Sequence, residues 1–160
     1  MRTTNPFFAG VVGGVVMSLL MTVARARGIP VNTELLLGTF PGGSPGPSEW
    51  IAGFAVALLL AGAIGGLYAR GFQLLAPRGG RRAAGAFSVV HAIVGGVMLE
   101  AVALIHPLVP HSIPDPGTFL GNFGPAGLLV FFSSHFAYGA VVGTFYEPGF
   151  VGNRLRVASR

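Results

Sequence analysis

The chain has 160 residues, of which 52% are apolar and 9% are charged, and its mean hydropathy is +0.70. A soluble domain carries about 25% charged residues, so ten basic and five acidic side chains are too few to cover a water-soluble globule. High hydrophobicity excludes a disordered chain, and the lack of cysteine excludes disulfides, thiol nucleophiles and cysteine-ligated metals. The composition therefore indicates a membrane protein.

Four continuous apolar segments are each long enough to cross a bilayer, which takes about 20 helical residues. Their unbroken apolar character favours helices, because the strands of a membrane barrel alternate between apolar and polar residues. The third segment contains His91 and Glu100, and the fourth contains His135. The sequence thus predicts an all-α integral membrane four-helix bundle, a single domain over 1–160 with spans at 7–24, 50–69, 83–105 and 126–146.

The placement of arginine predicts the orientation of these spans. Arg25 and Arg27 lie on one side, whereas the other eight arginines lie near the two ends of the chain and in the 70–82 segment. The positive-inside rule then places both termini in the cytoplasm. The arginines then explain the basic net charge, because they orient the spans and attract the headgroups of membrane lipids, which are the expected partners. The charge gives no reason to expect binding of nucleic acid. A signal peptide cleaved at Ala24-Arg25-Ala26 is the alternative for the first span, although its apolar stretch is longer than a typical signal core.

Three elements recur in the same order, which indicates a duplication with repeat 1 over about 7–69 and repeat 2 over about 83–146. Because each repeat has two spans, both repeats enter the membrane in the same direction. We therefore expect two parallel two-helix repeats with short interfacial helices in the outer loops. The matches are Gly13-Gly14-Val15-Val16-Met17 with Gly95-Gly96-Val97-Met98, Leu37-Gly38-Thr39-Phe40 with Leu120-Gly121-Asn122-Phe123, and Gly62-x-x-x-Gly66 with Gly139-x-x-x-Gly143.

The glycine-rich first span, the Leu-Gly-x-Phe element and the fourth-span motif His135-x-x-Tyr138-Gly139-x-x-x-Gly143 resemble a family of small four-helix bacterial membrane proteins without an assigned function. The resemblance covers most of the chain. It implies the four-helix fold and the bacterial inner membrane, and it implies no activity. Some members carry a second-span histidine at the place where the repeat alignment puts Leu58 in this chain.

Small residues recur about every four positions along the predicted spans. In lipid such residues let helix backbones approach closely, because packing rather than the hydrophobic effect drives helix association. A specific lipid or pigment lying against the glycines is the alternative. The predicted helix-packing residues are Gly10, Gly14, Ser18, Gly62, Gly66, Gly139 and Gly143.

Polar side chains inside the spans are candidates for function. Glu100 lies five residues from the outer end of its span and Ser18 lies six from the outer end of the first, so Ser18 or Thr22 can hydrogen-bond the Glu100 carboxyl. Glu100 is interpreted as a packing acid or as part of a proton relay. Tyr138 shares a helix face with His135, and we expect both to bond across a helix interface.

His91 and His135 are the candidate ligands for a haem or pigment. They lie 14 and about nine residues from the predicted outer ends of their helices, an axial offset of roughly 7 Å at 1.5 Å per residue. Axial ligands need similar heights, so this spacing disfavours bis-histidine ligation and favours structural roles. His106 and His111 share a loop whose prolines disfavour a metal site, and no metal or cofactor is predicted apart from bound lipids.

The outer loops contain the paired Leu-Gly-x-Phe elements. The segment Thr33-Glu34-Leu35-Leu36-Leu37 predicts a short capped helix with its leucines in the membrane interface. The elements would cap the bundle or form a docking surface, and capping is the preferred interpretation. The residues concerned are Leu37, Phe40, Leu120 and Phe123.

No Ser-His-Asp set, phosphate-binding loop or dinucleotide motif is recognisable, so intrinsic catalysis is not expected. The leading hypothesis is an accessory or structural subunit that packs with other membrane-protein subunits in a larger cytoplasmic-membrane complex, with electron transfer as the suggested process. The alternatives are a haem- or pigment-binding redox protein and a small channel or carrier that uses Glu100.

Overall fold

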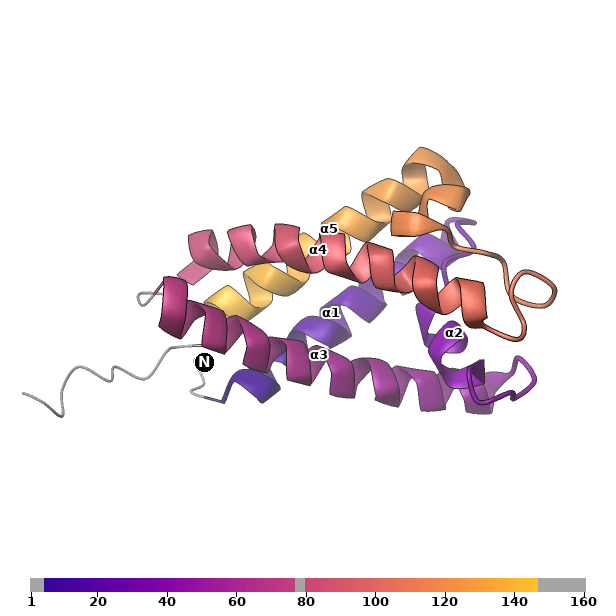
Figure 1. The fold of residues 1–160 in the computed structure, drawn as a ribbon, viewed down its shortest axis with the longest axis horizontal. Coiled ribbons are helices and arrows are strands. Elements are labelled where there is room, and N and C mark those ends of the chain that lie inside the picture. The colour runs from indigo at the N-terminus through magenta and orange to yellow at the C-terminus, as the bar shows by residue number, and fades with distance from the viewer. Residues whose placement is uncertain (1–4, 77–79, 147–160) are drawn as a thin grey trace, which may run out of the picture.

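The computed structural model describes residues 5–76 and 80–146, and these residues form the predicted all-α bundle (Figure 1). Four helices are long and apolar enough to cross a membrane, which gives the chain the architecture of a multi-pass membrane protein. The elements are α1 (Pro6–Ala26), α2 (Thr33–Thr39), α3 (Pro47–Leu75), α4 (Gly80–Ile105), the 3-10 helix η1 (Thr118–Phe123) and α5 (Gly124–Phe145).

Asparagine side chains begin two of the helices. The side-chain oxygen of Asn5 accepts hydrogen bonds from the backbone N–H groups of Phe7 at 3.0 Å and Phe8 at 3.3 Å. Asn32 accepts from the N–H of Leu35 at 3.2 Å and so caps α2. These bonds satisfy donors that a helix N-terminus otherwise leaves unpaired. The short capped helix predicted in the first outer loop is thereby confirmed.

Helix α3 is longer than predicted, because it ends at Leu75 rather than at residue 69. Its 29 residues span roughly 43 Å at 1.5 Å per residue, which exceeds a hydrocarbon core of about 30 Å. The sequence contains no helix breaker before Pro77, and a residue that precedes proline disfavours the helical conformation. The helix therefore continues past the exposed Arg70 and stops at Ala76.

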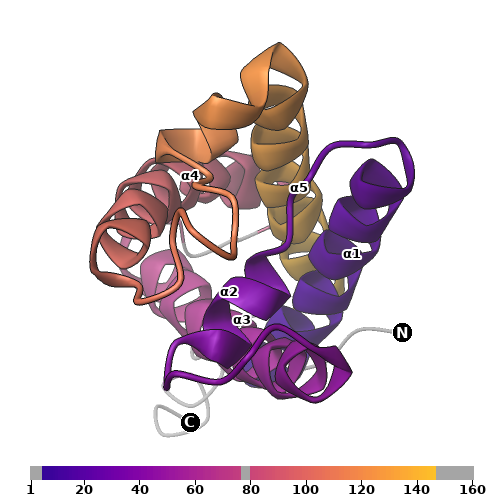
Figure 2. The same ribbon diagram turned by 90° about the vertical axis from the view of Figure 1, so that its right-hand side faces the viewer.

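The long helices do not close into a complete ring. Helix α1 packs along both α3 and α5, and α5 packs along α4, whereas α3 and α4 touch at few places. Helices α1 and α4 run in one direction and α3 and α5 run back (Figure 1). We call the end that carries α2 and η1 the lid end. Seen from the lid end, α2 lies across the space that the long helices surround (Figure 2).

Glycines set the closest helix contacts. A methyl group on Gly10 would overlap the Ala61 carbonyl oxygen and lie 3.0 Å from the Cα atoms of Gly62 and Gly65, so α1 and α3 meet backbone to backbone. A methyl on Gly14 would lie 2.6 Å from the Ala61 Cβ. Such close approach is what small residues permit in membrane helices.

The remaining predicted packing glycines differ from one another. Gly62 faces the Phe7 ring, and Gly139 faces the Ser88 hydroxyl so closely that a methyl group could not fit. Gly66 does not follow the expectation, because a methyl on it would meet nothing within 4 Å in the described part of the chain. Gly143 is half-buried, and its packing role stays a prediction.

Each outer-loop helix is held by a glycine of the long helix that follows it. Gly53 of α3 lies directly on the Glu34 carbonyl oxygen of α2, and Gly127 of α5 lies directly on the Leu120 carbonyl oxygen of η1. The two predicted repeats therefore use the same device to attach their lid elements.

The turn through η1 contains two non-glycine residues in the left-handed region, Phe119 with φ 59° and Leu120 with φ 60°. This conformation is unfavourable for bulky side chains and persists only where packing holds it. It brings the Phe119 ring onto Gly96, where no methyl group would fit, and it buries Leu120 completely. Packing therefore overrides local preference in this loop.

Candidate functional site

The bundle encloses a cavity that opens sideways between α3 and α4. The inner cavity has a volume of about 240 Å³ and reaches Ser18, Glu34, His135 and Tyr138. The lateral groove, between α3 and α4, has a volume of about 600 Å³. Cavities of this size are typical of small-molecule sites. The two are adjacent and share seven lining residues, which are Thr33, Leu37, Leu60, Ile64, His91, Gly95 and Leu99.

Two histidines face each other where the groove meets the cavity. The ring centroids of His91 on α4 and His135 on α5 are 4.7 Å apart, with the rings at 69° to each other. The expected axial separation of these histidines is therefore wrong. Helix α5 begins at Gly124, earlier than predicted, and crosses α4 obliquely, so counting residues along each helix misjudged the heights (Figure 1).

The ring nitrogen atoms of the pair have different surroundings. His135 Nδ1 is 2.8 Å from the Phe131 carbonyl oxygen, and His91 Nδ1 is 3.5 Å from the Tyr68 hydroxyl. Neither Nε2 atom has a hydrogen-bond partner within the described residues. No fully buried side-chain nitrogen or oxygen there lacks a partner, so neither Nε2 atom is fully buried. Both rings line the inner cavity, from which these atoms are accessible.

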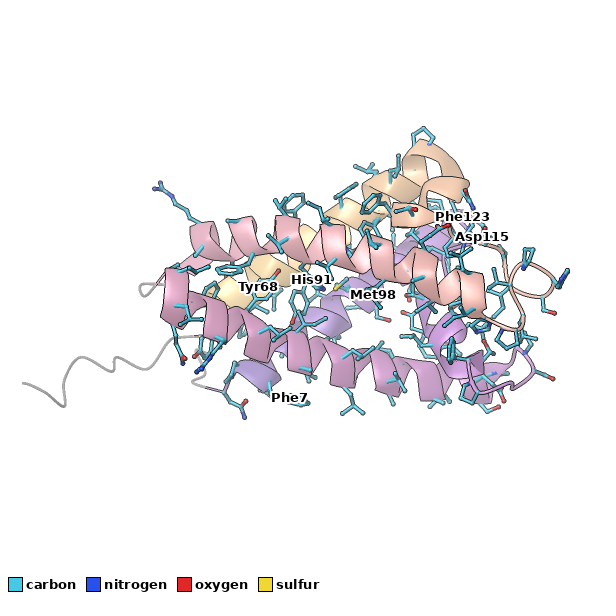
Figure 3. All side chains as sticks on the ribbon, in the orientation of Figure 1. Phe7, Tyr68, His91, Met98, Asp115 and Phe123 are labelled. Atoms are coloured by element: carbon cyan, nitrogen blue, oxygen red, sulfur yellow. The ribbon has the colours of Figure 1, made fainter. Side chains whose placement is uncertain are left out.

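A short relay of hydroxyl groups holds His91. The Ser88 hydroxyl donates to the Ala84 carbonyl oxygen at 2.8 Å, and the Tyr68 hydroxyl donates to Ser88 at 3.3 Å. Gly139 lies directly against Ser88 Oγ and leaves the space that this hydroxyl needs. A predicted packing residue thus also shapes the site. Figure 3 labels Tyr68 and His91, whose side chains lie between the ribbons of α3 and α4.

Tyr138 bonds across a helix interface, as the sequence predicts. Its hydroxyl donates to the Ala61 carbonyl oxygen at 2.6 Å, and its ring packs against Gly13 and lies 5.0 Å from the His91 ring. His135 contributes no such bond, because its Nδ1 contacts a carbonyl of its own helix. Tyr138 therefore joins the two repeats beside the histidine pair.

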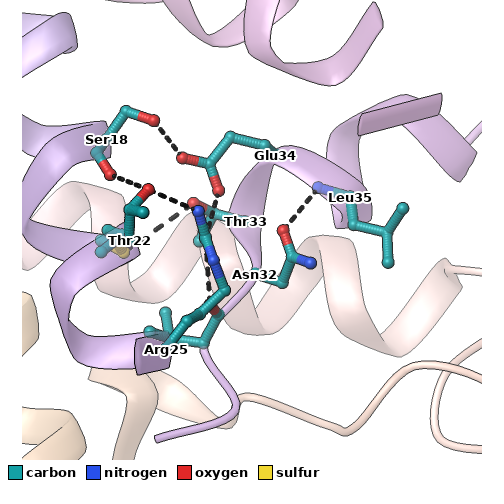
Figure 4. A network of polar contacts seen from close by, with 9 residues as sticks. Ser18, Thr22, Arg25, Asn32, Thr33, Glu34 and Leu35 are labelled. Carbon is teal, nitrogen blue, oxygen red and sulfur yellow. Dashed lines mark hydrogen bonds and ion pairs between the residues drawn. The ribbon is translucent and has the colours of Figure 1, made fainter. Parts of the chain in front are cut away.

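A charged network closes the lid end of the cavity (Figure 4). The two carboxylate oxygens of Glu34, which is 1% exposed, accept from the Ser18 hydroxyl and, at 2.9 Å, from Arg25. Arg25 also donates to the Thr22 hydroxyl at 2.7 Å and lies 6.0 Å from the Trp50 ring. The network ties α2 to the end of α1 and leaves no charge on Glu34 unpaired.

The expected bond between Ser18 and Glu100 is wrong. Ser18 bonds Glu34, whereas Glu100 is half-buried and accepts a 3.1 Å bond from the Thr118 hydroxyl. A shared depth, from which the bond was inferred, does not determine which neighbouring element a side chain faces. Glu100 lines neither the inner cavity nor the lateral groove.

His106 is a second attachment for the lid. Its Nε2 lies 2.9 Å from the Leu36 carbonyl oxygen and 3.3 Å from the Thr39 hydroxyl, and its Nδ1 accepts from the Leu108 N–H at 3.1 Å. His111 is exposed and apart from it. The described residues contain no group of three or more His, Cys, Asp or Glu that could hold a metal ion.

The Leu-Gly-x-Phe side chains occupy three different settings. Leu120 is completely buried, and Phe123 packs beside it in the same apolar cluster. Leu37 is half-buried and lines both the inner cavity and the lateral groove, and its predicted place in the membrane interface stays a prediction. Phe40 is 41% exposed and contacts the His106 ring edge-on at 5.5 Å.

The histidine pair does not fit a haem held between two axial imidazoles. Metal–imidazole bonds of about 2.0–2.1 Å on each side require roughly 6 Å between the ring centroids. The observed separation is 4.7 Å, and the T-shaped arrangement turns the rings away from a common axis. The two histidines therefore do not match bis-histidine ligation of a haem.

Sequence reasoning missed Glu34, Arg25 and Tyr68 as parts of the site. The available signal for Glu34 was its position directly before three leucines. An acidic side chain in such an apolar segment needs a polar or charged partner when it is buried. Comparison with known protein families, with curated proteins and with solved structures finds no match.

Proposed function

We propose that this chain is a non-catalytic integral membrane protein that binds an amphipathic molecule from the lipid phase, as an accessory subunit of a larger complex in the bacterial inner membrane. Its termini would lie in the cytoplasm, as the arginine distribution favours. The observation that carries the proposal is that His91 lines both the lateral groove and the inner cavity, and that its ring contacts His135 there.

The groove suits an aliphatic tail. Its lining is mostly apolar side chains from α3 and α4, with Leu36 and Leu37 of α2, and a lipid-phase molecule would enter it between α3 and α4. The groove itself has few polar residues, Thr33, Tyr68 and His91, whereas the inner cavity adds His135 and the Ser18–Glu34 pair. A tail in the groove and a headgroup at the histidines would satisfy both regions.

The proposal can be tested by closing the groove. Val94 and Val97 on α4 are similarly exposed, at 54% and 56%, but only Val94 lines the groove. The full chain is extracted gently from its membrane, and the amphiphiles that co-purify are quantified by mass spectrometry. Stoichiometric retention of one amphiphile that Val94→Trp abolishes and Val97→Trp preserves would support the proposal. Equal retention in both variants would contradict it.

The same preparation tests the accessory role through its native mass. Recovery of the chain in one large stoichiometric complex is the expected result. Recovery as a monomer or a small homo-oligomer would contradict the accessory role. The ligand-binding proposal would not be affected, because the Val94→Trp and Val97→Trp variants test it separately.

A further inference from the structure

We infer that the headgroup held beside the facing rings of His91 and His135, within reach of their Nε2 atoms, is that of an alkyl- or prenyl-tailed hydroquinone, bound in its hydroxyl-bearing reduced form. The inference rests on the ligand-binding function proposed above and specifies its ligand class. It concerns recognition only and includes no electron transfer step.

His135 presents a fixed hydrogen-bond acceptor. A neutral imidazole carries one N–H, and the 2.8 Å contact with the Phe131 carbonyl oxygen requires that N–H on Nδ1. The Nε2 atom is therefore a lone-pair acceptor. It lies toward Gly95, where a methyl group would be only 2.9 Å away, and it is accessible from the inner cavity. A ligand at this atom must supply a donor.

His91 presents a second acceptor through the hydroxyl relay. Ser88 donates to Ala84 and so must accept from the Tyr68 hydroxyl, whose oxygen then accepts from His91 Nδ1–H. This leaves His91 Nε2 without a hydrogen. Two acceptors on facing rings match the two O–H donors of a hydroquinone, whereas the carbonyl oxygens of a quinone are acceptors only.

Charge excludes an anionic headgroup. Neither the inner cavity nor the lateral groove is lined by an arginine, and the acidic group that lines the cavity is Glu34. Its nearest cation, Arg25, already pairs with it at 2.9 Å. A lipid phosphate would find a carboxylate and no free cation, so the site favours a neutral headgroup.

Aromatic side chains surround the proposed headgroup position. The Phe131 and His135 ring centroids are 4.2 Å apart, and the Tyr138 ring lies 5.0 Å from His91. Ring pairs at such distances are favourable in tilted and edge-to-face arrangements. A planar ring with two hydroxyl groups and an aliphatic tail thus combines the chemistry of the cavity with that of the groove.

The test compares two probes that differ by two hydrogen atoms. The full chain in lipid nanodiscs is titrated under anaerobic conditions with decylhydroquinone and, separately, with the corresponding decylquinone. We expect the hydroquinone to bind about tenfold more tightly, which corresponds to roughly one net hydrogen bond. This comparison uses the unmodified protein, so it does not depend on whether a variant folds.

Variants locate the preference. His135→Gln replaces the fixed acceptor with an amide that can also donate, and it should reduce the preference for the hydroquinone to about twofold or less. Ser133→Ala on the same helix, at an exposed position whose hydroxyl bonds the Val130 carbonyl, should keep the full preference.

The possible failures are distinguishable. Equal binding of the two probes, or tighter binding of the quinone, would overturn the hydroquinone inference and leave the proposed function intact. The same holds if neither probe binds while a phosphatidylcholine binds saturably and Val94→Trp abolishes that binding. Absence of saturable binding for all three molecules would overturn both proposals.

Discussion

The hydroxyl of Tyr138 on α5 donates a 2.6 Å hydrogen bond to the backbone carbonyl oxygen of Ala61 on α3. Gly10 of α1 lies directly on the same carbonyl group. Three of the four long helices therefore meet at one peptide unit, and the repeats are joined there beside the histidine pair. The fourth helix, α4, is joined through α5, which leaves its side toward α3 free to form the groove.

The bond from Tyr138 predicts a measurable stability effect. Tyr138→Phe keeps the ring against Gly13 and removes only the hydroxyl, and the Ala61 carbonyl remains within its helix. We expect a loss of about 1 kcal/mol in the free energy of unfolding, measured by denaturant titration in mixed micelles. Tyr146→Phe is the control, because no hydrogen bond of its hydroxyl occurs within the described residues. Equal effects of the two substitutions would contradict this assignment.

Two glycines that look alike in sequence should respond differently to alanine. A methyl group on Gly10 would overlap backbone atoms of α3, which cannot move aside, so Gly10→Ala should destabilise the bundle by about 1–3 kcal/mol. Gly66 has open space, and Gly66→Ala should be neutral or stabilising by up to about 1 kcal/mol, because alanine favours helix. Similar losses for both in the same titration would show that α1 and α3 are not in backbone contact.

The ion pair between Glu34 and Arg25 should control the lid. Glu34→Gln can keep the hydrogen bond from Ser18. It replaces the carboxylate that faces Arg25 with the NH2 group or the uncharged oxygen of an amide, so the charge-assisted bond from Arg25 is weakened or lost. We expect amide hydrogen exchange in α2 to become about tenfold faster. Glu49→Gln is the control, because the Glu49 carboxylate accepts only from the neighbouring Ser48 among the described hydrogen bonds. Unchanged α2 exchange in Glu34→Gln would contradict the role of the pair.

His106 should act on the lid from the other side. His106→Phe retains an aromatic ring beside Phe40 but removes the acceptor for the Leu108 N–H and the contact with the Leu36 carbonyl oxygen. Exchange at the Leu108 amide should increase by about tenfold or more, while His111→Phe, at an exposed position, should leave it unchanged. Slow hydrogen exchange of the Leu108 amide in both variants would contradict this assignment.

Much of the fold could be predicted because it depends on composition and local pattern. Hydropathy located the four long helices. The sequence Thr33-Glu34 followed by three leucines predicted a short helix, and the structure confirms it as α2 at Thr33–Thr39. The C-terminal end of α3 was predicted too early, because Arg70 was taken as the end of the apolar span. The chain in fact continues as a helix to Leu75, shortly before the next proline.

The site could be predicted only in part, because it depends on helix rotation and tilt. Ser18 faces α2, so its partner is Glu34 and not Glu100. His91 and His135 were separated by counting residues along parallel helices, whereas oblique packing of α5 on α4 brings the rings together. Neither rotation nor tilt is encoded in hydropathy, and both follow from glycine contacts such as that of Gly139 with Ser88.

The central claim is that an amphiphile enters between α3 and α4 and reaches the histidine pair. The most direct measurement is a crystal structure of the full chain grown from a lipid phase without removal of its bound amphiphiles. We expect elongated density along the groove beside Ile64 and Val94, ending in the inner cavity beside His91 and His135. Side chains of α3 and α4 packed directly against each other, with Leu60 touching Val94 and no path to the histidines, would contradict it.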